Sequence, residues 1–285
     1  MTRHPSPRGR PAAEARTVAT AAALLARCTA ARERRRPIEP IWQACYDHAL
    51  PAPGGDAALF DATAADAAEQ LAASLLAELT PPWSRWFGLA PSRALDDSPA
   101  GRAATESLED AAATLQAHFD RSNFAIEMHQ AFLDLVVAGT AVLLVEEAPL
   151  GEASAFRFAA LPAQTAILEE GPDGRLTTLF REARLTPAAI AARYPGAALP
   201  AMSDAEARLR VVEATWADGP AIRHAALLAE DPDRPVTLAE GRFAEHPVIA
   251  FRWLKAPGES YGRGPVMKAL PDIRTANKVV ELVLK

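Results

Sequence analysis

The chain has 285 residues, of which 49% are hydrophobic and 23% charged, and its formal net charge is -6. This length allows one large domain or two smaller ones, and no apolar run reaches the roughly 18 residues that a membrane span requires. An acidic chain lacks the basic face with which proteins grip DNA phosphates, which disfavours sequence-specific DNA binding. The two cysteines, Cys28 and Cys45, are too few for a disulfide framework.

The first 154 residues are predicted to be mostly helical. Residues 1–12 contain three prolines and several arginines without apolar periodicity, so we expect a disordered arm. Residues 13–154 form a helical part that ends in one buried strand at 140–145, where the apolar residues are continuous and β-branched. Apolar residues spaced by three or four positions predict helices at 13–36, 42–49, 61–79, 98–119 and 122–139.

Residues 155–254 are predicted to form an antiparallel, β-rich part. Gly171-Pro-Asp-Gly174 has the composition of a hairpin turn, and Thr186-Pro187 is typical of the start of a short helix. We expect the residues up to about 245 to form one meandering sheet. The predicted strands lie at 156–158, 165–168, 176–180, 211–216, 222–228, 236–238 and 248–253.

Residues 255–285 combine a glycine-rich turn with a long helix. Gly258, Gly262 and Gly264 allow tight turns and close backbone approach, and Pro265 suits the first turn of a helix. Pro271 is expected to kink or restart that helix. The helix reaches Lys285 without a stop signal, from which we expect the chain to be the first part of a longer protein. Together the elements predict an α+β protein with a long terminal helix.

Three aromatic residues follow the helix predicted at 61–79, namely Trp83, Trp86 and Phe87. One interpretation is a satellite apolar cluster under a loop. The other is an anchor at a subunit boundary, where aromatic residues are enriched. The sequence favours neither.

No pattern in the chain predicts catalysis, a cofactor or a metal. The glycine-rich turn follows a strand and precedes a helix, but Pro265 removes a backbone N–H and no lysine stands in the phosphate-loop position. No His-x-x-x-His pair is present for zinc, and adjacent carboxylates such as Glu146 and Glu147 point to opposite faces of a strand.

Several short stretches between about residues 35 and 285 resemble the portal (head-to-tail connector) proteins of short-tailed, T7-like bacteriophages, and they follow one another in the same order as in that family. The most specific is Tyr261-Gly-Arg-Gly264 followed by a helix containing Asp272 and Asn277. The residues that carry the resemblance, and that we take as motif or assembly candidates, are Trp83, Trp86, Phe87, Ser122, Asn123, Phe124, Gly139, Arg252, Trp253, Glu259, Tyr261, Gly262, Arg263, Gly264, Asp272 and Asn277.

The resemblance implies a ring, typically of twelve subunits, at one vertex of a phage head. The partners that it implies are the major capsid and scaffolding proteins, terminase and a tail adaptor. Double-stranded DNA would pass through the channel of the ring without sequence-specific binding. No contact with a membrane is expected. The subunit would be made in the host cytoplasm and reside in the virion. Residues 13–250 would form the outer wing and 265–285 would begin a stem helix. Family members continue into a clip, a second stem helix, a tunnel loop and a crown, so the resemblance implies that this chain is a truncated gene product, a fragment or a prophage remnant.

Two other classes remain as hypotheses. A minor structural or scaffold-like phage protein would bind a partner without forming a ring, and would stay monomeric at high concentration. A metal-dependent hydrolase with an unrecognised site would cleave DNA only with a divalent cation.

Overall fold

The computed structural model describes residues 10–52, 59–91, 98–197, 199, 204, 206–232 and 234–285, with side chains from residue 20 onward. Residues 1–9 of the predicted arm lie outside the described residues, and residues 10–12 already belong to a helix. The described elements confirm the predicted α+β class, including the long terminal helix. They pack as two compact units, one of residues 1–39 and 164–246 and the other of residues 40–163 and 247–285.

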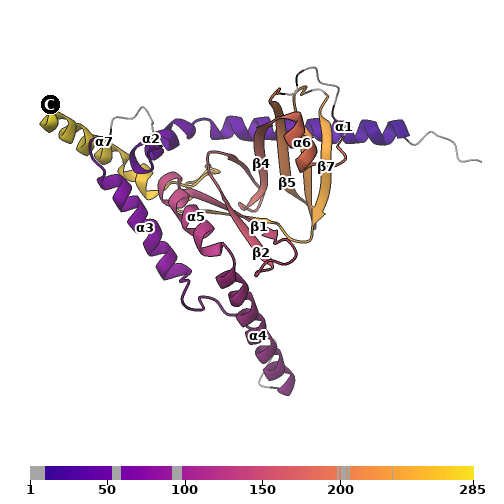
Figure 1. Ribbon diagram of the computed structural model, residues 1–285, viewed down its shortest axis with the longest axis horizontal. Coiled ribbons are helices and arrows are strands. Elements are labelled where there is room, and N and C mark those ends of the chain that lie inside the picture. Colours follow the sequence, from indigo (N-terminus) through magenta and orange to yellow (C-terminus); the bar gives the residue numbers. More distant parts are fainter. Residues whose placement is uncertain are drawn as a thin grey trace, which may run out of the picture. The chain divides into compact units, whose positions relative to one another are not determined.

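The first unit is a five-stranded antiparallel sheet with a helix on each face (Figure 1). The strands follow one another in chain order, so the sheet is a meander, as predicted. The hairpin at 171–174 joins the first two strands, and Gly174 has the positive φ of 77° that this turn uses. The elements are α1 (Arg10–Arg35), β3 (Ala166–Glu170), β4 (Leu176–Leu185), α6 (Pro187–Arg193), β5 (Leu209–Asp218), β6 (Ala221–Leu228) and β7 (Val236–Phe243).

Helices α1 and α6 lie on opposite faces of this sheet, as the alternating side chains of its strands show. On β5, Val212 packs with the α1 residues whereas its neighbour Val211 packs with α6. Ion pairs fix α1 further, since Arg27 lies 2.6 Å and Arg34 3.2 Å from the Glu169 carboxylate. The guanidinium of Arg35 donates to the backbone oxygen of Ala166 at 3.1 Å.

The second unit combines helices with a three-stranded antiparallel sheet of order β2-β1-β8. The central strand β1 is buried at its start and pairs Val142 with Leu161 of β2 and with Ala250 of β8. The elements are α2 (Glu39–Ala49), α3 (Thr63–Leu79), α4 (Pro99–Arg121), α5 (Phe124–Ala138), β1 (Thr140–Glu147), β2 (Phe156–Leu161), β8 (Val248–Arg252) and α7 (Pro265–Leu284).

Two local expectations differ from the structure. The single sheet predicted for 155–245 is divided, because β2 follows β1 through a short hairpin and pairs with it instead of joining the meander. Helix α7 continues as one helix through Pro271 and does not restart there, whereas the kink stays a prediction. The boundaries proposed at 154 and 254 stay predictions. Among the described helices, none is both long and apolar enough to span a membrane.

Candidate functional site at the start of the terminal helix

Three glycines interlock where α5 ends and α7 begins. Gly139 ends α5 in the left-handed conformation, with φ 75°, and leads directly into β1. The turn before α7 crosses this point so closely that a Cβ at Gly262 would overlap the backbone oxygen of Gly139. A Cβ at Gly264 would lie 2.5 Å from the backbone oxygen of Val136. Only glycine allows both backbones to approach in this way.

Backbone and side-chain hydrogen bonds hold the crossing in place. The buried hydroxyl oxygen of Thr140 accepts a bond from the N–H of Gly262 at 2.8 Å. The N–H of Trp253 donates to the Gly139 oxygen at 3.0 Å, and the N–H of Arg263 donates to the Leu254 oxygen at 2.9 Å. The turn is thereby fixed to α5, β1 and the end of β8 together, so the start of α7 has little freedom to rotate.

A buried aromatic pair supports the same crossing. Tyr261 is 4% exposed, and its ring meets that of the fully buried Trp42 edge to face at a centroid distance of 5.0 Å. The indole N–H of Trp42 donates to the Ala138 oxygen at 2.9 Å. Because the last carbonyls of a helix have no partner within it, this bond satisfies the end of α5 and joins it to α2.

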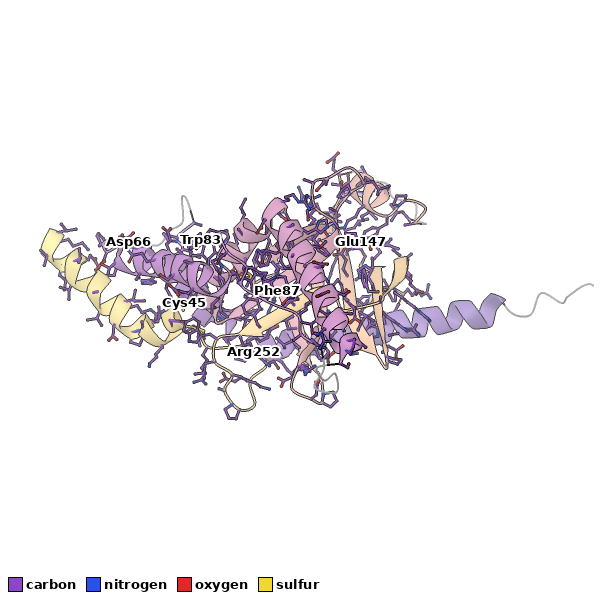
Figure 2. The ribbon with its side chains drawn as sticks, turned by 90° about the horizontal axis from the view of Figure 1, so that it is seen from below. Cys45, Asp66, Trp83, Phe87, Glu147 and Arg252 are labelled. Carbon is purple, nitrogen blue, oxygen red and sulfur yellow. The ribbon has the colours of Figure 1, made fainter. Side chains whose placement is uncertain are left out.

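Charged side chains line the outer side of the turn. The guanidinium of Arg252 donates to the Ser260 oxygen at 3.0 Å, and Arg263 pairs with Glu259. The hydrogen bond from Arg263 lowers the pKa of Glu259. Figure 2 labels Arg252 on this part of the second unit.

The two motif residues on α7 lie in different surroundings. The side-chain oxygen of Asn277 accepts bonds from the backbone N–H groups of Phe60, at 2.7 Å, and Asp61, at 3.1 Å. Asn277 therefore ties α7 to the chain that leads into α3. Asp272 is exposed and faces a groove between these two helices.

The groove lies between α3 and α7 at the start of both helices. Its volume is about 360 Å³, and small alanine side chains of α3 leave the space open. Two carboxylate residues stand among the otherwise mainly apolar lining. The lining residues are Asp61, Thr63, Ala64, Ala67, Ala68, Leu71, Val136, Pro265, Val266, Ala269, Asp272, Ile273 and Ala276.

Ser122, Asn123 and Phe124 form a separate cluster at the junction of α4 and α5. The Asn123 side chain donates to the Phe158 oxygen at 2.8 Å and accepts from the Phe158 N–H at 2.9 Å, which clamps β2. Ser122 accepts a bond from the Phe124 N–H at 3.1 Å. These residues position β2 and do not contribute to the glycine crossing.

The aromatic residues after α3 were expected to form either an apolar cluster under a loop or an anchor at a subunit boundary, and the structure places them in different surroundings. Trp86 stacks on Phe124 at 5.7 Å and on Phe119 at 5.8 Å, and Phe87 meets Phe119 edge to face. They thus form the internal apolar cluster. Trp83 is 73% exposed, so its role at a subunit boundary stays a prediction.

The sequence pattern did not reveal the roles of Thr140 and Trp42, because nothing in it links them to a turn more than 100 residues away. The sequence also did not predict the groove, although residues 61–79 are rich in alanine, whose small side chain allows another helix to pack closely. Within the described part of the chain, no cluster of three or more His, Cys, Asp or Glu residues could hold a metal ion.

Two comparisons bear on this arrangement. A family model described as bacteriophage head to tail connecting protein matches residues 21–285. The chain is also similar to the probable portal protein of Bordetella phage BPP-1, with 26% identity over 281 residues. That match covers 88% of this chain and 50% of the relative, so the chain spans about half the length of that protein.

Proposed function

Because the chain belongs to the family of bacteriophage head-to-tail connecting proteins, we propose that it is the subunit of a portal ring at one vertex of a phage head. Double-stranded DNA would enter and leave through the centre of this ring. The role is structural, with no catalytic step and no cofactor.

The observation that carries the proposal is the rigid attachment of α7 to the rest of its unit. The family match runs through the glycine crossing and the terminal helix, and the crossing fixes the direction in which α7 leaves. A ring needs such a connection, because each copy must present the same helix at the same angle to its neighbours. The last turns of α7 carry exposed apolar side chains that suit a protein partner, namely Val279, Leu282, Val283 and Leu284.

The net charge of the chain and the paired lysines of α7 are consistent with a channel through which DNA passes without binding tightly. The net charge is -6, and the exposed face of α7 mixes both signs, with Lys278 and Lys285 each paired to Glu281. Cations that are already paired offer less to a phosphate backbone, whose binding depends on free Lys and Arg.

The ring would meet the major capsid and scaffolding proteins during assembly, then terminase and later the tail adaptor. The subunit would assemble in the host cytoplasm and remain in the virion. Twelve copies are the number that the family resemblance suggests.

The test is the mass of the purified chain in solution, measured by light scattering across a range of concentrations, with negative-stain images of the same fractions. Closed rings of constant diameter support the proposal. A chain that remains monomeric at the highest concentration contradicts the ring for this polypeptide and favours the non-ring structural alternative.

A further inference from the structure

An exposed tryptophan stands just beyond the end of α3. Trp83 is 73% exposed, and it follows Pro81-Pro82, which end the helix. The N–H of Ser84 donates to the Pro81 oxygen at 3.4 Å, which closes a turn around Trp83. Arg85, two residues later, is also exposed. The chain therefore presents a large aromatic side chain next to a cation on a short, proline-stiffened segment.

The groove between α3 and α7 has matching properties. Its volume of about 360 Å³ exceeds the roughly 150 Å³ that accommodates a benzene ring in an engineered protein cavity, so the groove has volume enough for an indole ring. Its walls are mainly alanine, leucine, valine and isoleucine side chains, and it includes the carboxylate residues Asp61 and Asp272. An apolar ring next to a cation is complementary to an apolar groove next to carboxylates.

The groove and the tryptophan lie at opposite ends of the same helix. The α3 residues that line the groove lie in its first three turns, as far as Leu71, whereas Trp83 follows its last residue, Leu79. From Ala67 to Leu79 the helix rises about 18 Å. Trp83 therefore cannot enter the groove of its own chain while α3 stays helical. Figure 2 labels Asp66 and Trp83, which lie on either side of this span.

We propose that Trp83 of one copy inserts into the α3–α7 groove of the next copy, with Arg85 facing Asp272 or Asp61 at the rim. This inference rests on the proposed ring, and it names the contact by which neighbouring subunits recognise each other. Such a contact joins two different surfaces, so it is head-to-tail and closes when the rotation between copies returns to the start.

The first test uses the full chain and compares self-association by sedimentation velocity. Trp83→Ala is expected to raise the dissociation constant between copies about tenfold or more, because buried tryptophans dominate interface energetics. The control is Leu150→Ala, which removes a fully exposed apolar side chain elsewhere on the surface and is expected to leave association unchanged. Thermal unfolding of the monomer should be unaltered in both variants.

The second test fills the groove and reverses its charge. Ala67→Phe places a ring where the partner's tryptophan would lie, whereas the control Ala73→Phe adds the same ring at an exposed α3 position outside the groove. Only the first is expected to weaken association. Arg85→Asp and Asp272→Arg should each weaken it, and the double variant should recover most of the loss.

The outcomes separate the two proposals. If the wild-type chain associates but Trp83→Ala, Ala67→Phe and Arg85→Asp all associate equally well, the Trp83 contact is wrong and the ring stands. If the wild-type chain is monomeric at every concentration, the ring fails for this chain, and the contact fails with it. If the charge-reversal pair shows no recovery while Trp83→Ala still weakens association, Asp272 is not the rim partner of Arg85.

Discussion

Gly139 and Gly262 lie in direct backbone contact although 123 positions separate them in the sequence, and neither position has room for a Cβ. This contact joins the end of α5 to the turn before α7. In a ring, the contact at the start of α7 sets the angle at which this helix leaves each subunit. The proposed function therefore depends on this contact being rigid.

Replacing Gly262 by alanine should therefore destabilise the protein. The added methyl group would overlap the Gly139 oxygen, which is backbone and has no alternative rotamer. We expect a loss of about 3 kcal/mol in the free energy of unfolding, at the upper end of the cost of overpacking, measured by urea denaturation. Gly88→Ala is the control, because no atom lies within 4 Å of a Cβ at that position. Equal stability of the two variants would contradict the close contact.

The hydroxyl of Thr140 supplies the second prediction. Thr140→Val keeps the volume of the side chain but leaves the buried Gly262 N–H without its acceptor, at a cost of about 1–3 kcal/mol. Thr140→Ser keeps the hydroxyl and removes one methyl group, which costs about 1 kcal/mol. In chemical denaturation the serine variant should be the more stable of the two. The reverse order would show that the methyl group, and not the hydrogen bond, holds the crossing.

Most helices and strands and part of this site were predictable from the sequence. Features that depend on neighbouring residues could be predicted, whereas contacts between distant segments could not. Helix caps such as Ser98 and Gly139 act within a few residues, so their pattern is visible locally. The glycines before Pro265 indicated a close approach but not to what, because the partner of Gly262 is fixed by the pairing of β1 with β8. Pairings between distant segments leave no local pattern in a single sequence, which also explains why the position of β2 beside β1 was missed.

Lowering the pH should reduce the stability of the first unit, because Glu213 becomes protonated. Burial alone would raise its pKa, but the hydrogen bond from Tyr194 at 2.5 Å and the charges of Arg193 and Arg181 lower it below its ordinary value of 4.5. A carboxylate with a lowered pKa in the folded state stabilises the protein above its unfolded pKa, and this stabilisation is lost as the pH falls. Wild type should be more stable than Glu213→Gln at pH 7, and the difference should shrink from about pH 5 downward.

The control for this pH series is Glu245→Gln, at an exposed position of the same unit. It should follow the wild-type curve from neutral to acid pH. A wild-type advantage over Glu213→Gln that stays constant across the series would mean that the lost group acts through packing and not through its charge.

Asn277 is expected to control the local stability of the segment that enters α3. Its side-chain oxygen accepts from the N–H groups of Phe60 and Asp61, and both residues precede the helix that forms one wall of the groove. Asn277→Ala removes this acceptor. Because a typical hydrogen bond contributes about 0.5–1.5 kcal/mol, amide exchange at residues 60 and 61 should accelerate by up to about tenfold.

Hydrogen exchange with mass spectrometry checks this prediction, with two comparisons. Asn277→Asp retains a side-chain oxygen that can accept both bonds, so it should preserve most of the protection. The neighbouring change Lys278→Ala, at an exposed position, should leave residues 60 and 61 unaffected. Since Asp61 lines the groove, loss of protection in Asn277→Ala should be accompanied by weaker self-association. Faster exchange with unchanged association would separate the anchoring role of Asn277 from the proposed contact with Trp83.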